Sequence, residues 1–176
     1  YLSDVTDFEL LRQKYDNEKL CLAYVRFDNY EDVMKGMSET TRANISGEVN
    51  EVLSKWAEEE NGFISRSNKE LCLIGFNQAV LRDLMEQKFP VLDSVREIHV
   101  GNKITPTVSI GIACEGDNLE ELSQNAVKAL DLALGRGGDQ VVVAVDGGTQ
   151  FFGGTTTVTA KSTRVRARIV AHTIHE

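Results

Sequence analysis

The sequence predicts an α+β domain in which helices cover a mixed sheet of five strands, as in ferredoxin-like folds. Three observations lead to this prediction. Strand-like segments alternate with amphipathic helical segments along most of the chain. Two consecutive strand-like segments are separated only by a short polar tip, which indicates an antiparallel hairpin. Because a hairpin stands among strands that are separated by helices, a mixed sheet is more natural here than a doubly wound parallel one.

The N-terminal third of the chain predicts a helix, a buried strand and a second helix. Residues 4–15 place apolar side chains on one stripe behind Asp4, a favoured capping residue, and so predict a short helix. Residues 19–27 are rich in apolar and aromatic side chains and predict a buried strand. Residues 41–60 predict an amphipathic helix. The apolar positions are Val5, Phe8, Leu11 and Tyr15 in the first helix, and Ile45, Val49, Val52, Leu53 and Trp56 in the second.

The middle of the chain predicts a β-hairpin, a helix and a strand. Two short apolar runs, 63–65 and 71–76, flank the polar tip 66–70. Residues 77–89 repeat apolar side chains at helical spacing and stop at Pro90. Residues 104–113 alternate as a strand does.

The last predicted elements are an amphipathic helix over 119–134, ended by Gly135, and a buried strand over 140–145. After Gly147 the composition changes to Gly-rich, then Thr-rich, then basic. We therefore expect a domain over 1–147 and a basic linker over 148–176, with packing back on the domain as extra strands left open.

The charge distribution argues against nucleic acid as a partner. The chain has 27 acidic and 19 basic residues, yet residues 155–176 contain four basic residues and one acid. The body is therefore strongly acidic, whereas DNA and RNA surfaces need Lys and Arg against phosphates. Apolar runs are far too short to span a bilayer and no signal peptide is evident, so we expect no direct membrane contact.

The sulfur and imidazole groups give no strong sign of a metal site. Cys21, Cys72 and Cys114 are well separated, odd in number and set in apolar runs, which favours buried free thiols in a reducing compartment. His172 and His175 lie three residues apart, but the sequence offers no third ligand near them.

A glycine-rich string at 135–140 resembles a phosphate-binding loop, but its position argues otherwise. Such loops follow a strand and open a helix, so that the helix N-terminus faces the anion. Here the string follows a predicted helix and precedes a strand, which presents a carboxyl end that repels anions. A glycine-rich helix stop is the better interpretation.

Several strings resemble the GGDEF domain of nucleotide-cyclase palms over residues 3–145. They are Ser3–Phe8, the strand sequence VSIGI at 108–112 and the helix with its turn at 126–141. The resemblance implies a GGDEF-like palm whose signature hairpin tip is Ser67-Asn-Lys-Glu-Leu71 and whose first strand ends at Arg26–Tyr30.

The same resemblance implies that the metal site is lost. Active members hold Mg²⁺ with acidic residues at the positions of Arg26 and Lys69. A cation about 4 Å from a divalent ion would cost about 8 kcal/mol at an effective dielectric constant of about 20, as an upper bound. The guanine-reading Asn corresponds to Met34, and the inhibitory RxxD motif has no counterpart in 58–63. We therefore expect no bound metal and no diguanylate cyclase activity.

Six residues remain as candidates for nucleotide contact: Arg26, Asp28, Ser67, Asn68, Lys69 and Glu70. In one hypothesis Arg26 and Lys69 replace the metal charge and hold nucleotide phosphates, while Asp28 or Glu70 orients water or a remaining cation. In the alternative, the two cations only pair with the two acids on a solvated rim. No cofactor is required, although ATP with Mg²⁺ is a candidate ligand.

Four strings resemble those of GdpP-type cyclic-di-AMP phosphodiesterases. They are Phe27–Tyr30, the turn at 134–141, Phe152–Gly154 and Arg164–Ala171. That resemblance implies a degenerate GGDEF domain between a PAS domain and a DHH-type phosphodiesterase domain, at the cytoplasmic face of the plasma membrane. It implies a regulatory module that senses nucleotide. The alternatives are a weak ATPase that uses Asp28 or Glu70, and a structural spacer that forms a homodimer.

Overall fold

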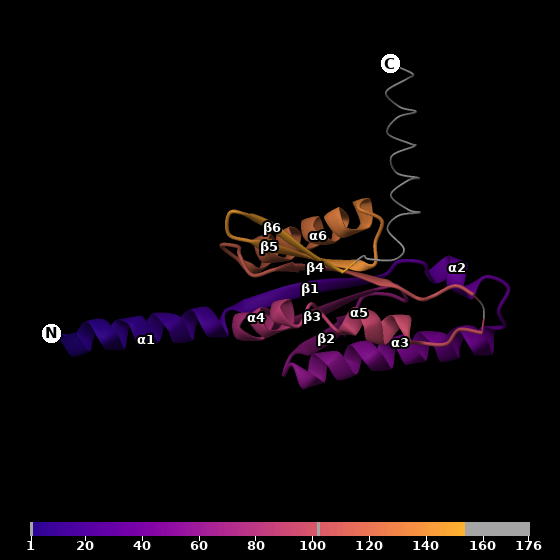
Figure 1. Ribbon diagram of the computed structural model, residues 1–176, viewed down its shortest axis with the longest axis horizontal. Coiled ribbons are helices and arrows are strands. Elements are labelled where there is room, and N and C mark those ends of the chain that lie inside the picture. Colours follow the sequence, from indigo (N-terminus) through magenta and orange to yellow (C-terminus); the bar gives the residue numbers. More distant parts are fainter. Residues whose placement is uncertain (1, 102, 154–176) are drawn as a thin grey trace, which may run out of the picture.

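The computed structural model describes residues 2–101 and 103–153, which form one layered α+β body with a projecting N-terminal helix (Figure 1). The elements follow the order expected from the sequence, with three additions. They are α1 (Leu2–Glu18), β1 (Leu20–Phe27), α2 (Tyr30–Met34), α3 (Glu39–Glu59), β2 (Phe63–Arg66), β3 (Leu71–Asn77), α4 (Gln78–Glu86), α5 (Val91–Arg96), β4 (Val108–Ala113), α6 (Leu119–Gly135), β5 (Gln140–Val145) and β6 (Gly148–Gly153).

The sheet is mixed, as predicted, but contains six strands instead of five, in the order β2-β3-β1-β4-β5-β6. Only the β4–β5 pair is parallel; the other neighbours are antiparallel. The sixth strand pairs with β5 through a two-residue turn at Asp146 and Gly147. An Asp-Gly pair with positive φ at the glycine (84°) is a strong hairpin signal. The sheet thus extends beyond position 147 through β6, which is one of the extra strands that the sequence allows but does not require.

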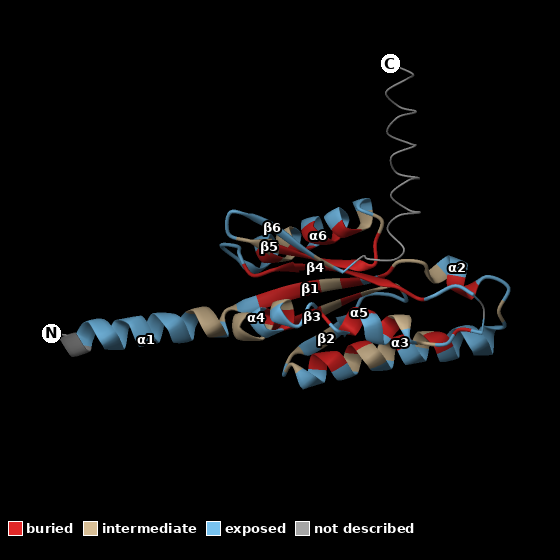
Figure 2. Cartoon of the chain, in the orientation of Figure 1, coloured by how far each residue is buried: buried red, intermediate tan, exposed pale blue. Residues whose placement is uncertain are grey.

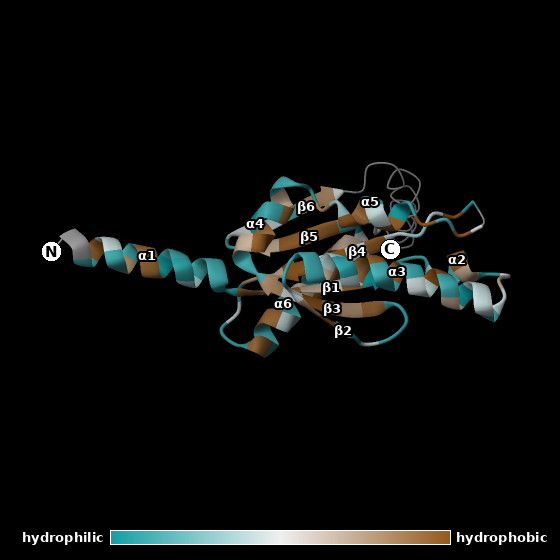
Figure 3. Ribbon diagram, turned by 90° about the horizontal axis from the view of Figure 1, so that it is seen from below, coloured by the Kyte–Doolittle hydropathy of each residue, from teal (hydrophilic) through white to brown (hydrophobic). Residues whose placement is uncertain are grey.

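Helices cover both faces of the sheet. α3, α4 and α5 lie on one face and α6 lies on the other (Figure 1). The larger core cluster lies between the sheet and the helices α3, α4 and α5, and it includes Trp56, Phe76 and Phe89. The central strands and the inward faces of these helices are buried (Figure 2), and the strands are hydrophobic (Figure 3). None of the helices in the described residues combines the length and the hydropathy needed to span a bilayer.

The long helix α3 confirms the predicted amphipathic pattern. It begins at Glu39, slightly earlier than predicted, because the Ser38 side chain accepts a hydrogen bond from the Thr41 backbone N–H and caps the first turn. Its buried residues are Ile45, Val49, Leu53, Trp56 and Ala57. This helix therefore packs against the sheet through the stripe that the sequence indicates.

On the opposite face, α6 approaches β4 closely because Gly111 has no side chain. A Cβ atom at Gly111 would lie less than 3.0 Å from the backbone of Ala126 and Leu130. The helix is capped by Asn118, whose side chain accepts from the Glu121 N–H. Small residues complete the contact, since Ala126, Ala129 and Ala133 are buried with Leu122 and Leu130.

The helix α1 is present but does not bury its apolar stripe. Val5, Phe8, Leu11 and Tyr15 are each between 54% and 69% exposed, and the helix projects from the body. It is joined to the body at its C-terminal end, where the Arg82 guanidinium donates a hydrogen bond to Asn17. The stripe therefore has no packing partner among the described residues.

Two short helices and two boundaries differ from the prediction. α2 and α5 are too short to show a helical period in the sequence. α4 ends at Glu86 rather than 89, because Lys88 and Phe89 adopt positive φ (58° and 53°) and turn the Phe89 ring into the core. β4 begins at Val108 rather than 104, since Pro106 has no N–H for a ladder.

The prediction of three free thiols is wrong for two of them. Cys21 and Cys114 form a disulfide. They are opposite each other because the antiparallel register that pairs Leu22 with Ala113 continues by one residue. Wide spacing in the sequence is no evidence against pairing here, because β1 and β4 are distant in the sequence but neighbours in the sheet. Cys72 is free and buried, and burial raises the pKa of its thiol to about 11.

Candidate functional site

The hairpin tip between β2 and β3 is held by the Asn68 side chain. Its amide oxygen accepts hydrogen bonds from the backbone N–H groups of Glu70 (2.8 Å) and Leu71 (2.9 Å). The Ser67 and Asn68 N–H groups in turn donate to the Leu71 carbonyl, at 3.0 and 3.2 Å. Asn68 therefore closes the tip with its own side chain.

The tip is joined to the end of the first strand. The Phe27 N–H donates a 2.8 Å hydrogen bond to the Glu70 carbonyl, and Arg26 lies opposite Leu71 in the register. Because β1 and β3 are adjacent antiparallel strands, Arg26 and the tip are neighbours although more than forty residues separate them in the sequence. The structure therefore unites the two segments that the sequence analysis selected.

Four of the six predicted site residues line one open cleft. Arg26, Asn68, Lys69 and Glu70 surround it together with Leu71, and its volume is about 370 Å³. We refer to it as the tip cleft. The Arg26 guanidinium lies 3.7 Å from the Glu70 carboxylate, and both side chains are partly exposed. An ion pair in such a position contributes about 0–1 kcal/mol, so a ligand can displace it.

Asp28 does not line the tip cleft. Its carboxylate accepts hydrogen bonds from the Thr107 hydroxyl (3.1 Å) and from the Asp139 backbone N–H (2.9 Å). A Cβ atom at Gly138 would lie 2.9 Å from the same carboxylate. Asp28 therefore fixes the turn between α6 and β5 instead of facing the cleft. The sequence could not show this, because the partners lie about 80 and 110 positions further along the chain.

Ser67 is also outside the residues that line the tip cleft. The rim pairing proposed as the alternative hypothesis is found for one pair only, Arg26 with Glu70. Lys69 makes no ion pair within residues 2–101 and 103–153. The cleft thus presents one paired cation and one cation without a carboxylate partner among those residues.

Arg66 fixes the hairpin against α3, a role that sequence analysis missed. Its guanidinium donates to the Asn50 side chain, to the Asn50 carbonyl (3.0 Å) and to the Ser54 hydroxyl (2.7 Å). These contacts place the tip beside the middle of α3 and leave a cavity of about 20 Å³ between them. No local pattern indicates this contact, since an arginine in a polar tip usually faces solvent.

The glycine-rich string at 135–140 is a helix stop, as predicted. The Gly138 N–H donates to the Ala133 carbonyl (2.9 Å), and both Gly137 and Gly138 have positive φ. Asp139 is only 2% exposed, and the Arg96 guanidinium donates to both of its carboxylate oxygens, at 2.9 and 3.1 Å. The string therefore ends α6 and joins it to α5 through the Arg96–Asp139 contact.

The described residues contain no group of three or more His, Cys, Asp or Glu side chains that could hold a metal ion. His172 and His175 lie outside the described residues.

Comparison with known proteins supports the resemblance seen in the sequence. A model of the family described as "Cyclic-di-AMP phosphodiesterase GdpP-like, GGDEF domain" matches residues 25–151. The chain is 39% identical over 177 aligned residues to the cyclic-di-AMP phosphodiesterase GdpP of Bacillus subtilis, and 37% identical to PdeA of Listeria monocytogenes. All of this chain is aligned in both cases, but it spans only 27% of each relative.

Solved structures show the same fold at lower identity. The GGDEF domain of DgcB from Caulobacter crescentus, solved with c-di-GMP, has a TM-score of 0.62 and 18% identity, with 80% of this chain and 88% of that chain covered. A diguanylate cyclase/phosphodiesterase from Caldicellulosiruptor saccharolyticus gives 0.63 at 16% identity, with 82% and 87% covered. From the family match and the relatives together, the chain belongs to the family of GGDEF domains of GdpP-like cyclic-di-AMP phosphodiesterases.

Proposed function

We propose that this domain is a regulatory module of a cyclic-di-AMP phosphodiesterase and that it responds to a nucleotide bound in the tip cleft. Since the chain spans about a quarter of its named relatives, the phosphodiesterase chemistry belongs to other parts of the parent protein. In this proposal a PAS domain precedes this module and a DHH-type domain follows it, in a membrane-anchored parent with the module at the cytoplasmic face.

The observation that supports the proposal is that Arg26 and Lys69 both line one cleft. A guanidinium presents a planar fork to phosphate oxygens, and an ammonium adds a compact positive charge. The Asn68 amide oxygen is occupied within the hairpin, which leaves its NH₂ group as a donor for a ligand oxygen. The cleft therefore suits the phosphates of a nucleotide.

The same donor set does not fit Mg²⁺. Among the residues that line the tip cleft, Glu70 supplies the one carboxylate, and it lies beside Arg26. Mg²⁺ prefers near-octahedral oxygen coordination, with one or two carboxylates and substrate phosphates. Two cations in the cleft oppose a divalent ion on Coulombic grounds. We therefore propose that phosphates are held directly and that the domain does not join GTP molecules.

A slow ATPase is the second candidate, and the geometry restricts it to Glu70. Asp28 is held by Thr107 and Asp139 and does not reach the tip cleft, so it is unsuited to orient water there. Purified Glu70→Gln should then lose phosphate release while Asp28→Asn, if folded, retains it. Equal loss in both variants, with native circular dichroism, would contradict this assignment.

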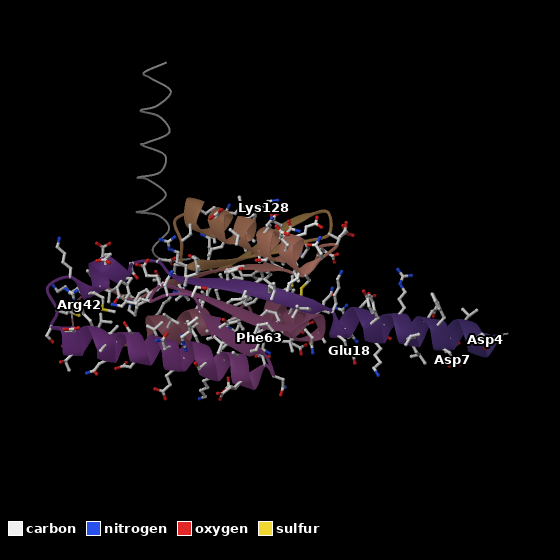
Figure 4. All side chains as sticks on the ribbon, turned by 180° about the vertical axis from the view of Figure 1, so that it is seen from behind. Asp4, Asp7, Glu18, Arg42, Phe63 and Lys128 are labelled. Atoms are coloured by element: carbon white, nitrogen blue, oxygen red, sulfur yellow. A yellow bond between two sulfur atoms is a disulfide. The ribbon has the colours of Figure 1, made fainter. Side chains whose placement is uncertain are left out.

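The test of regulation uses the full-length parent. Arg26→Ala and Lys69→Ala are expected to abolish the change in cyclic-di-AMP hydrolysis that ATP or GTP produces. Lys128→Ala, on the exposed surface of α6 (Figure 4), is the matched control and should respond as the wild type does. If neither nucleotides nor the two cleft variants change parent activity, the proposal fails. The alternative is then a structural spacer that forms a homodimer.

A further inference from the structure

A second cavity lies between α3, α4 and α5, away from the tip cleft. It has a volume of about 270 Å³. Its apolar lining, which we call the floor, includes Val52, Trp56, Leu84 and Val91, and its charged lining, which we call the rim, consists of Lys55, Glu59 and Glu60. None of the residues that line this cavity lines the tip cleft. We call it the three-helix cavity.

Trp56 lines the cavity and carries a buried indole N–H without a hydrogen-bond partner among the described residues. The side chain is only 7% exposed. Buried donors in native proteins are nearly always paired, so an unpaired indole N–H indicates a missing acceptor. A backbone carbonyl of a docked segment would satisfy it, whereas a Lys or Arg side chain has donors only.

The rim of the three-helix cavity favours a cation. Burial, followed by the nearby charges of Glu59 and Asp83, raises the pKa of Glu60. Lys55 lies 3.8 Å from Glu59, whereas no ion pair involves Glu60 within the part of the chain that the structure describes. A Lys or Arg side chain combines an apolar stem, which fits the floor, with a charged head for the carboxylates and the indole face.

The same chain has such side chains within reach. The described chain ends at Gly153, where a Cβ atom would lie 2.6 Å from Leu92 of α5. The Phe152 ring packs on Phe89, with 5.1 Å between centroids. Phe89 and Leu92 flank Pro90 and Val91 in sequence, and these two line the cavity. Eight residues from Gly153 to Lys161 can span up to about 26 Å, at about 3.3 Å per residue.

We propose that the three-helix cavity binds an arginine side chain of residues 161–168 of the same chain. The segment contains Lys161, Arg164, Arg166 and Arg168 and no acidic residue. Charge complementarity, the apolar floor and the position of Gly153 all favour this occupant. Since residues 161–168 lie between this domain and whatever follows it in the relatives, the contact would fix the path of that connection. The inference does not depend on nucleotide binding in the tip cleft.

The indole N–H of Trp56 provides a direct test, because it is the single tryptophan of the chain and gives one resonance in a ¹H–¹⁵N spectrum. In the full chain at low salt, the triple variant Arg164→Gln/Arg166→Gln/Arg168→Gln is expected to shift this resonance, and Glu60→Gln should shift it similarly. A synthetic peptide of residues 159–170 added to the triple variant should restore the wild-type position. The control variant Arg12→Gln/Lys14→Gln/Lys128→Gln removes the same charge from exposed sites and should leave the resonance unchanged.

Carbodiimide cross-linking gives an independent readout of the occupant. It is expected to join the Lys161 amine to Glu59 or Glu60 within one chain, as seen by mass spectrometry of the monomer. Mixed ¹⁴N- and ¹⁵N-labelled chains distinguish links within a chain from links between chains. An indole resonance that is identical in wild type and the triple variant would overturn the proposal, as would Lys161 links that form only between copies or spread equally over distant acids.

Discussion

Gly111 lies where β4 meets α6, and its replacement by alanine tests the packing of this face of the sheet. The added Cβ would lie less than 3.0 Å from the backbone of Ala126 and Leu130, and only 2.5 Å from the Leu130 Cα atom. Normal carbon–carbon contacts are about 3.5–4.0 Å, so α6 would have to move by about 1 Å or more. Overpacking of this kind costs about 1–3 kcal/mol, and we expect the upper part of that range because both obstacles are backbone atoms.

The assay is equilibrium unfolding in urea, followed by far-UV circular dichroism. Gly47→Ala in α3 is the matched control, because no atom lies within 4 Å of its added Cβ and the residue is helical. That substitution should stabilise the domain, by up to about 1 kcal/mol. A Gly111→Ala variant that unfolds at the same urea concentration as the wild type would refute the close approach of β4 and α6.

Three further predictions concern the buried ion pair, the thiols and one surface pair. Asp139→Asn should destabilise the domain by about 3–5 kcal/mol, because it leaves Arg96 without its buried partner. Asp93 is the second partner of Arg96 and its side chain is 73% exposed, so Asp93→Asn should cost about 1 kcal/mol or less. Equal effects of the two variants in urea unfolding would contradict the assignment. Ellman's reagent should find one thiol in the denatured, unreduced chain and three after reduction, and almost none in the native chain at pH 8, because burial raises the pKa of Cys72 to about 11. Glu115 raises the pKa of Lys19 above 10.5 through a 2.8 Å hydrogen bond, so Glu115→Gln should destabilise the domain by less than about 1 kcal/mol at pH 7. The difference in unfolding free energy between variant and wild type should fade as the pH rises through that raised pKa. A difference that persists at pH 12 would contradict this reasoning.

The fold was largely predictable because its helices and strands have clear periods. α3 and α6 show complete apolar stripes with capping residues, and both form where the sequence indicates. The sixth strand was left open, although Asp146 and Gly147 form a two-residue turn of a known type. The signal was obscured because β6 is mostly exposed and has no continuous apolar run.

The candidate site was predictable only in part, because its remaining contacts join distant segments. Arg26 and the hairpin tip were selected together, and the antiparallel β1–β3 pair explains why they meet. Asp28 follows Arg26 by two residues, but Thr107 and Asp139 hold it elsewhere. The Cys21–Cys114 disulfide and the Arg96–Asp139 pair likewise depend on neighbours in the folded state.

Calorimetric titration of the full chain with ATP, in the presence of EDTA, tests most directly whether Arg26 and Lys69 hold phosphate without a metal. We expect binding by the wild type in EDTA, and binding at least tenfold weaker in Arg26→Ala/Lys69→Ala, with Lys128→Ala unchanged. A tenfold loss corresponds to about 1.4 kcal/mol, within the range of one or two charge-assisted hydrogen bonds. Heat that appears only when Mg²⁺ is added, and that is unaffected by the double substitution, would contradict the account.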